Sequence, residues 1–463
     1  MCRVIVLAVL CTSLGGGCLD LGASPEGVSG ESRHGWRAAG FGSKPAMAPP
    51  ARRAEDASAE AIDQLRAELL DKIQRSPCPG EPCPVVAFTA QPAPAVEASR
   101  GKRILLIDDA IVLQGVVRWP GRVIGVLGLA ADGAYHDVTP PLAMVRDALD
   151  VFATIDGFPA PVLGTDLDIA SAFFTRFSLT LPADSFGHGM DILPFLAERI
   201  PGAQFVLSED QMDAPTPCEL IDAAPDSAAW SAHDAFVRNM ATTLARTIVD
   251  HGINYVHLSW GIGQGELSNT FVLRCGRGPS AATARRYMEP YVALLTSLTS
   301  LTTPDATGHL RPVIVFQAGA RGTDPDARRL DCAEIANRVR VFSVPYIGTA
   351  VPAEGSHDYS LLPTSIASLG CNDVFIVMGY TSIFDPTRGD QYFPSMPFGL
   401  GRAPRPAWPP ASSFANPIAL AHFVRITQDH PCDTTEQWLD RVTDDWSQPI
   451  LDPLLYNSFP SEP

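Results

Sequence analysis

Charged side chains are scarce in this sequence of 463 residues, and positive charge is scarcer than negative. Only 18% of the residues are Asp, Glu, Lys or Arg, whereas 46% are hydrophobic, so most of the chain should fold around a sizeable core. Lys and Arg together number 34 against 51 Asp and Glu, which gives a formal net charge of −17. Because such a surface repels phosphate backbones, the composition argues against a nucleic-acid partner.

Long hydrophobic runs are missing from the body of the chain, so the sequence predicts no membrane-spanning helix there. The apolar run at 4–14 follows Arg3 and is too short to cross a bilayer, which is typical of an export signal. Three glycines and Cys18 come next and resemble a bacterial lipobox, except that glycine stands at position 15, where a branched aliphatic residue is usual. We expect a signal peptide over 1–17, lipidation at Cys18, and an exported protein that is anchored in the cell envelope or secreted. The lipid would be its only membrane contact.

Clusters of metal ligands are also missing. No two histidines stand at helical spacing, and Cys78 and Cys83 have no second pair at zinc-ligand spacing. The sequence therefore predicts no metal site, although it leaves a structural calcium open. Seven of the ten cysteines follow residue 18, and an exported protein can join them in disulfides. Cys78 and Cys83 could close a small loop, and the odd number predicts one free thiol, while the other pairings stay open.

The composition divides the chain into four parts. After the signal peptide, residues 18–100 are rich in Gly, Ser, Ala and Pro and predict a tether, with one short helix at 54–75 that we interpret as a spacer. Residues 101–430 have the alternating texture of a folded domain. Residues 431–463 predict a C-terminal tail that packs on that domain.

From residue 103 onward, apolar runs of strand length alternate with stretches of helical spacing. Residues 104–107, 205–207 and 313–316 are apolar throughout, which is typical of strands buried on both faces. Alternation with helices is typical of a parallel sheet. The sequence therefore predicts an α/β fold of three layers, a parallel sheet with helices on both faces. In such sheets, functional side chains gather at the carboxyl ends of the strands.

Three polar residues stand where such a fold would gather them. Asp108 directly follows the apolar run at 104–107. His188 lies between two glycines just before a helical stretch, and glycine lets a backbone or a substrate approach the imidazole closely. Ser413 opens an apolar helix, where free N–H groups and the positive end of the dipole suit an oxyanion. Taken singly, each is also what an ordinary strand-end aspartate, loop histidine or helix cap looks like.

In this order, the three segments resemble the motifs of the subtilisin-like serine proteases (subtilases). That family has a strand that ends in Asp, a His-Gly motif that opens a helix, and Gly-Thr-Ser-Met-Ala-x-Pro at a second helix. The run Ser-Phe-Ala-Asn-Pro at 413–417 is the most specific match, since proline is unusual within a helix. Residues 254–261 are similar to the family's substrate-lining strand, and 317–322 are similar to its Ala-Ala-Gly-Asn-x-Gly loop. The resemblance spans residues 102–430.

The resemblance implies a subtilisin-like fold and an exported serine endopeptidase that acts on peptides or proteins without a required cofactor. Ser413 would attack the scissile carbonyl, and His188 would take its proton and return it to the leaving amine. Asp108 would orient His188 and stabilise its charged form. An extended peptide would pair, as an added strand, with the backbone of three residues: Ser259, Trp260 and Gly261.

The motifs also depart from the family's pattern. Asp108 is followed by Asp109 instead of Ser or Thr, His-Gly-Thr-His becomes His-Gly-Met-Asp, and Gly-Thr before the serine becomes Ala-Ser. Ala320 stands where the family has the asparagine that helps to hold the oxyanion, and loss of one such donor costs about 100- to 1000-fold in turnover. Gln317 or Arg321 could supply a substitute donor. We expect a slowed protease, and the alternative is an inactive pseudoprotease that binds peptide or protein.

A third interpretation is an α/β-hydrolase with Ser259 as its nucleophile. The run His-Leu-Ser-Trp-Gly at 257–261 is similar to a nucleophile elbow, but glycine is missing two residues before the serine, where crowding demands it. A strand-to-helix turn at Ser259, near His422 or His430, would favour this interpretation.

Overall fold

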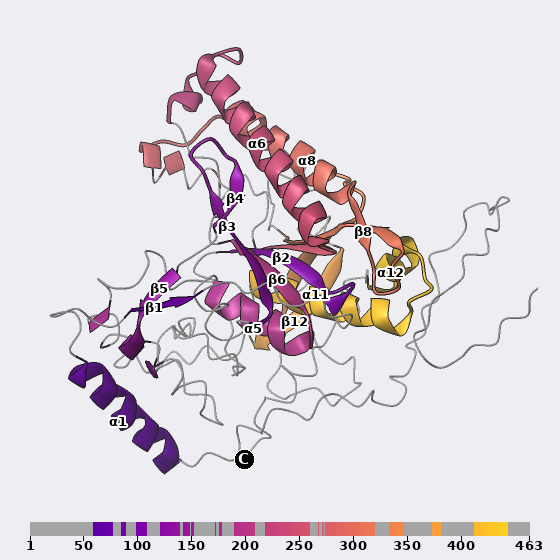
Figure 1. Ribbon diagram of the computed structural model, residues 1–463. Helices are drawn as coiled ribbons and strands as arrows, with labels where there is room; N and C mark the ends of the chain where they lie inside the picture. The colour runs from indigo at the N-terminus through magenta and orange to yellow at the C-terminus, as the bar shows by residue number, and fades with distance from the viewer. Residues whose placement is uncertain are drawn as a thin grey trace, which may run out of the picture.

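The structure of the protein is a computed structural model (Figure 1). It describes the following residues: 59–76, 85–88, 99–108, 121–138, 142–148, 150–151, 172, 176–177, 189–208, 218–259, 267, 271–272, 274–319, 333–346, 373–380 and 412–442. The predicted signal peptide over 1–17, Cys18, Cys78 and Cys83 lie outside these ranges.

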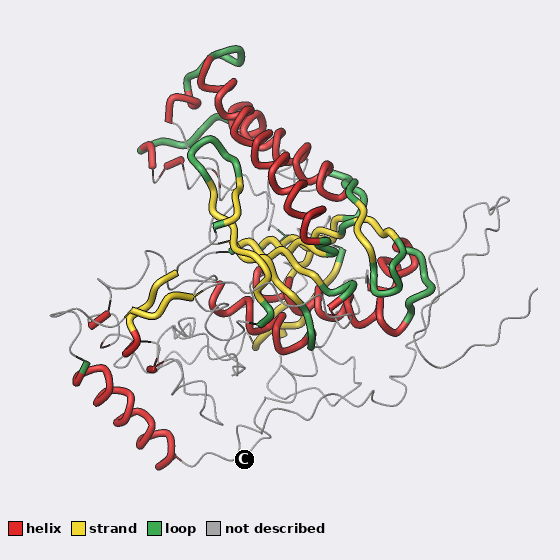
Figure 2. The backbone as a smooth tube through the Cα atoms, in the orientation of Figure 1, coloured by secondary structure: helices red, strands yellow, loops and turns green. Residues whose placement is uncertain are grey.

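The described elements alternate between strands and helices for much of the chain (Figure 2). In chain order they are α1 (Ala59–Arg75), β1 (Val85–Phe88), β2 (Arg103–Ile107), β3 (Val123–Leu129), β4 (Tyr135–Asp137), β5 (Leu142–Val145), α5 (Gly189–Arg199), β6 (Gln204–Ser208), η3 (Cys218–Ile221), α6 (Ala228–His251), β7 (Tyr255–Leu258), α8 (Ala281–Thr299), β8 (Thr302–Pro304), β9 (Leu310–Pro312), β10 (Ile314–Ala318), β11 (Arg338–Tyr346), β12 (Val374–Tyr380), α11 (Ser412–Asp429) and α12 (Thr435–Val442).

One eight-stranded sheet organises the described part of the chain, in the order β12-β11-β10-β7-β2-β6-β3-β4. All neighbouring strands run parallel except β4, which pairs antiparallel with β3 at one edge. The predicted α/β class is confirmed, since the sheet is mostly parallel and is joined by helices. The apolar runs at the centre of the sheet explain this arrangement, because a strand with no polar face is stable only when both faces are covered.

Helices cover both faces of the sheet (Figure 1). On one face, α5, α11 and α12 pack against side chains such as Leu106 and Phe316. On the other face, α6 and α8 pack against Leu105 and Val315. Neighbouring residues of one strand thus enter different cores, because side chains alternate along a strand.

The strand order reverses at β2, in the middle of the sheet. From β2 the chain first builds β3 and β6 on one side, and then builds β7, β10, β11 and β12 on the other. Such a reversal is a topological switch point, where loops leaving the carboxyl ends of adjacent strands diverge and open a crevice. The carboxyl end of β2, where Asp108 follows, is therefore the expected place for a ligand or an active site.

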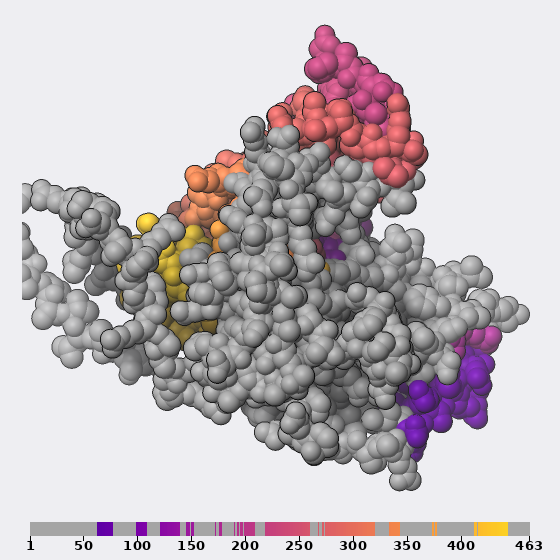
Figure 3. Space-filling view, turned by 180° about the vertical axis from the view of Figure 1, so that it is seen from behind, coloured from indigo at the N-terminus to yellow at the C-terminus, as the bar shows by residue number. Residues whose placement is uncertain are grey.

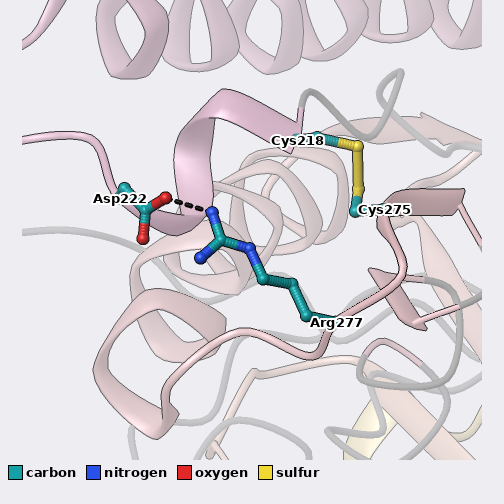
Figure 4. Close-up of a disulfide and its surroundings, with 4 residues drawn as sticks. All are labelled: Cys218, Asp222, Cys275 and Arg277. Atoms are coloured by element: carbon teal, nitrogen blue, oxygen red, sulfur yellow. Dashed lines mark hydrogen bonds and ion pairs between the residues drawn. A yellow bond between two sulfur atoms is a disulfide. The ribbon is translucent and has the colours of Figure 1, made fainter.

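Helices α6 and α8 extend past the strands that they cover (Figure 1), and in the space-filling view the part of the chain coloured pink to salmon projects at the top (Figure 3). Helix α6 has 24 residues, about 36 Å at 1.5 Å per residue, whereas the strand that follows it has only four. Since α6 ends where β7 begins, its first half projects beyond the carboxyl edge of the sheet. A disulfide between Cys218 and Cys275 joins η3, before α6, to the segment before α8 (Figure 4).

The stretch before residue 101 contains two described elements. In α1, the apolar residues Leu65, Leu69 and Ile73 are buried. The hydroxyl of Ser76 donates a hydrogen bond to Asp147 Oδ2 at 2.5 Å, just after α1 ends. Strand β1, within the stretch that the sequence predicts as a tether, pairs antiparallel with β5. The leader therefore makes contacts with residues of the region after 101.

Arg122 fixes the end of α5 to the sheet. Its guanidinium donates hydrogen bonds to the carbonyl oxygens of Ala197, Ile200 and Ala203 at 2.7, 2.9 and 2.8 Å. It also lies 5.1 Å from the ring centroid of Phe205. Burial lowers the pKa of Arg122 to about 10, so the guanidinium stays charged at neutral pH. These contacts supply a donor to the Ala197 carbonyl in the last turn of α5 and to two carbonyls of the turn that leads into β6.

We expect Arg122→Met to lower the free energy of unfolding by about 2–4 kcal/mol, because it removes three charge-assisted bonds and leaves their carbonyl acceptors poorly solvated. Arg122→Lys should have a smaller effect, since an ammonium keeps the charge but not the fork that reaches three acceptors. Urea unfolding followed by circular dichroism measures both. A loss below about 0.5 kcal/mol for the methionine variant, the range of ordinary surface changes, would contradict this role.

His233 is a buried titratable group between α6 and α8. The residue is 3% exposed, and its ring centroid lies 4.4 Å from that of Tyr287 and 5.7 Å from that of Trp230. Burial lowers the pKa of His233, and this outweighs the raising effect of Asp234, whose Oδ1 lies 3.6 Å from Nδ1. Arg286, which pairs with Asp234, lowers it further. The imidazole is therefore neutral in the folded protein at pH 7.

This lowered pKa predicts a loss of stability in weak acid. The unfolded chain takes up a proton on this histidine near pH 6.5, whereas the folded chain does so only at a lower pH. The free energy of unfolding should therefore fall as the pH is lowered from about 6.5 toward the folded-state pKa. His233→Phe should remove this slope, which urea titrations between pH 7 and pH 5 would measure. An equal slope in both proteins would contradict the prediction.

Candidate active site

Asp108 lies between the carboxyl ends of two strands that flank β2. Its N–H donates to the carbonyl of Ser208 at 3.1 Å, which extends the pairing of β2 with β6 by one residue. Its Oδ2 accepts a hydrogen bond from the hydroxyl of Ser259, the residue that follows β7. Asp108 as a whole residue is 3% exposed and therefore buried. Because Ile107 pairs with Leu258 in parallel register, the next residue of each strand falls beside the other, and this brings Asp108 and Ser259 together.

Helix α11 places its first turn over the carboxyl ends of β7 and β10. The side-chain amide of Asn416 donates to the carbonyl of Leu258 at 2.8 Å and to that of Phe316 at 3.2 Å. At the other end of the helix, Thr427 Oγ1 lies 3.4 Å from the hydroxyl of Tyr255, the first residue of β7. The helix therefore runs antiparallel to the strands, and its N-terminus lies at their carboxyl edge.

Ser413 is the second residue of α11 and precedes Asn416 by three positions, so both lie in the first turn and a half of the helix. Its side chain is partly exposed. Since Asn416 bonds to Leu258, the residue before Ser259, the turn that carries Ser413 lies at the same edge as the bonded pair of Asp108 and Ser259. The free N–H groups and the positive dipole end of α11 are at this edge as well.

Helix α5 begins at Gly189, the residue after His188. It packs against α11, and side chains of both helices, including Leu196 and Ala419, share one core. Because α5 leads through a short turn into β6, it also runs antiparallel to the strands and begins at their carboxyl edge. The two helices thus open at the same edge, on the same face of the sheet. His188 itself lies outside the described residues.

The described residues include only part of the predicted site. Asp108, Ser259 and Ser413 are described, and all three stand at the carboxyl edge of the central strands. Four further predicted residues lie outside the described ranges: Trp260, Gly261, Ala320 and Cys18. The same is true of Arg321.

Gln317 is a correction to the sequence-based expectation. Its side chain leaves the sheet on the face opposite α11, so it does not point toward the turn that carries Ser413 and does not supply the substitute donor considered above. Its neighbour Phe316 belongs to the core beneath α11, and the side chains of β10 alternate. The Oε1 atom of Gln317 accepts a hydrogen bond from Arg338 Nη1 at 3.3 Å on the opposite face.

Two contacts of the site are not evident from the sequence patterns. The hydroxyl of Ser259 bonds to Asp108, a contact separate from the predicted role of its backbone in lining the substrate. Asn416 was noted only as part of a motif, although a polar residue within the apolar run at 414–420 is a signal that something polar lies opposite it.

The α/β-hydrolase interpretation gains no support from the two histidines that it requires. His430 follows the end of α11, which lies beside Tyr255 at the start of β7, whereas Ser259 follows the end of that strand. The Nδ1 atom of His422 lies 3.2 Å from Nη2 of Arg425, an exposed contact on α11 that does not involve Ser259.

The remaining chemistry of the described residues is structural. Among them, no three or more His, Cys, Asp or Glu side chains come together as a metal site would require. None of the described helices has the length and apolar character needed to span a membrane. Near the disulfide of Cys218 and Cys275, Arg277 pairs with Asp222 (Figure 4). Cys432 is also disulfide-bonded.

Comparisons with known proteins give this chain no family. No protein-family model matches the sequence, and no curated protein matches it. The functional assignment therefore depends on the motifs and on the geometry of the carboxyl edge.

Proposed function

We propose that this protein is an exported, subtilisin-like serine endopeptidase with Asp108, His188 and Ser413 as its catalytic residues. One observation carries the proposal: the buried carboxylate of Asp108 and the first turn of α11, which bears Ser413, meet at the topological switch point of a parallel sheet. These residues are more than 300 positions apart in the sequence.

The setting of each group suits its role in acyl transfer. The backbone of Asp108 is fixed by its bond to Ser208, and its carboxylate accepts a hydrogen bond from Ser259, so it could orient an imidazole without moving. The hydroxyl of Ser413 stands at a helix N-terminus, whose N–H groups and dipole favour the negative charge of a tetrahedral intermediate. Helix α5, which begins one residue after His188, packs directly on the helix that carries the nucleophile.

In the proposed reaction, Ser413 Oγ attacks the carbonyl carbon of the scissile bond while His188 accepts its proton. The tetrahedral intermediate collapses, His188 gives the proton to the leaving amine, and an acyl-enzyme remains on Ser413. Water, deprotonated by His188, then releases the acid product and restores the serine. Asp108 holds the imidazole in the tautomer that each step needs. A disulfide within the described residues agrees with export, since disulfides persist in oxidising compartments.

A fluorophosphonate probe tests the proposal, because it phosphonylates an activated serine and needs no knowledge of the natural substrate. The folded protein should be labelled in a time-dependent manner, and the heat-unfolded protein should not. Equal labelling of both, or labelling of neither at high probe concentration, would overturn the protease proposal.

The second candidate is a pseudoprotease that binds peptide or protein without cleavage, and the residue that favours it is Ala320. If only the oxyanion donor is lacking, we expect Ala320→Asn to raise peptide turnover by about 100- to 1000-fold, since an amide there would stabilise the oxyanion. Ala320→Asp is the matched control, because it has the same shape without an N–H donor, and it should give no gain. Turnover of a generic peptide ester, measured for both variants and the wild type, would show whether a donor at position 320 raises the rate. No gain in the asparagine variant would show that Ala320 is not what limits the rate.

A further inference from the structure

Asn416 is a fully buried polar residue on the most apolar face of α11. Its neighbours Ala415, Ile418 and Ala419 are all buried in the core between α11 and the sheet. Within this apolar setting its side-chain amide donates hydrogen bonds to two strands. One goes to the carbonyl of Leu258 in β7 at 2.8 Å, and the other to the carbonyl of Phe316 in β10 at 3.2 Å. One side chain near the start of the helix is thus bonded to the last residue of β7 and to the middle residue of the adjacent strand β10.

Stability does not explain the choice of an amide at this position. The Oδ1 atom of Asn416 is buried and has no hydrogen-bond partner among the residues that the structure describes. A buried acceptor without a donor is costly, and this cost offsets the gain from the two donated bonds. What the two bonds do achieve is geometric, since contacts to two different strands fix the helix both along and across the edge of the sheet.

We propose that Asn416 is a positioning residue that holds the Ser413 hydroxyl at the carboxyl edge, beside the bonded pair of Asp108 and Ser259. The inference rests on the proposed function of Ser413 as the nucleophile. Residues three apart in a helix move as one rigid turn, so a shift of Asn416 shifts Ser413 with it. The reason that such a residue matters is that a misplacement of about 1 Å can cost about 100-fold in rate.

The test compares reactivity with stability in three variants. In Asn416→Ala, the second-order rate constant for fluorophosphonate labelling should fall about 10- to 100-fold, while the midpoint of thermal unfolding changes little. Asn416→Ser keeps a donor that can serve one carbonyl, so its rate should lie between those of the alanine variant and the wild type. Thr427→Val is the matched control, because it removes the other polar contact between α11 and β7, at the far end of the helix. Its labelling rate should stay within about twofold of wild type, since it leaves the first turn in place.

Two results would overturn the proposal: labelling of Asn416→Ala at the wild-type rate, or a loss of rate in every variant that simply follows its loss of thermal stability. Hydrogen exchange keeps the question separate from the protease proposal. Amides at 258–259 and 413–417 should exchange faster in Asn416→Ala but not in Thr427→Val. Unchanged exchange there refutes the positioning role even if the wild type is labelled. If the wild type is not labelled, the protease proposal fails, and faster exchange confined to those segments still supports the role of Asn416 in holding the turn.

Discussion

Replacing Ser413 by alanine is expected to lower kcat for peptide hydrolysis by about 10⁴- to 10⁶-fold. Loss of the nucleophile costs about 10⁶-fold in a triad protease with a complete oxyanion hole, and the lower bound of about 10⁴-fold applies if the lack of an oxyanion donor at Ala320 already costs about 100-fold. Substrate binding should persist, because the hydroxyl contributes little to the ground-state complex. Progress curves with a generic peptide substrate at high protein concentration would measure the change.

The adjacent serine supplies the control for this experiment. Ser412 is the first residue of α11, is partly exposed like Ser413, and could also cap the helix. Ser412→Ala should therefore retain kcat within a few-fold of wild type while losing up to about 1 kcal/mol of unfolding free energy. If the two alanine variants are equally active, the assignment of Ser413 as the nucleophile is wrong.

Replacing Asp108 by asparagine is expected to lower kcat by about 10³- to 10⁴-fold. An amide in place of the carboxylate can hold the imidazole in the wrong tautomer and cannot stabilise its charged form. The fold should survive, since an asparagine carbonyl can still accept the hydrogen bond from Ser259. The measurement is kcat at a pH where His188 would be neutral, together with a thermal unfolding curve for each protein.

Two further variants make the interpretation specific. Asp109→Asn removes the same charge one position later and should change kcat by no more than a few-fold, because the triad proposal gives Asp109 no role, whereas the carboxylate of Asp108 is the one that accepts the bond from Ser259. Ser259→Ala removes one hydrogen-bond donor to Asp108. Its kcat should lie between that of Asp108→Asn and that of Asp109→Asn. An Asp109 variant as inactive as the Asp108 variant would point to a general effect of local charge and away from a triad.

Much of the fold follows from patterns that are local in the sequence. The apolar run at 104–107 has no polar face, and it forms β2, the central and fully covered strand. The same holds for 205–207 and 313–316, which lie within β6 and β10 or at their start. What the patterns could not supply was the order of the strands. Strand order depends on which helix packs on which face, and that is settled by packing between segments far apart in the chain.

The candidate site was predictable in its residue types and less so in its contacts. The position of Asp108 at a strand end and that of Ser413 at a helix start both follow from the sequence. The bond from Ser259 to Asp108 depends on the parallel register of β2 and β7, and no single segment encodes that register. The expectation for Gln317 was wrong for a related reason, because the face on which a strand residue emerges is fixed only once the strand has neighbours.

The most direct measurement of the central claim is the position of the adduct in the phosphonylated protein, found by mass spectrometry of its peptides. The proposed convergence of Asp108, His188 and Ser413 at the switch point predicts a single adduct on Ser413, formed only by the folded protein and lost in His188→Ala. An adduct on Ser259 or Ser412, or a Ser413 adduct that forms equally well without His188, would contradict it.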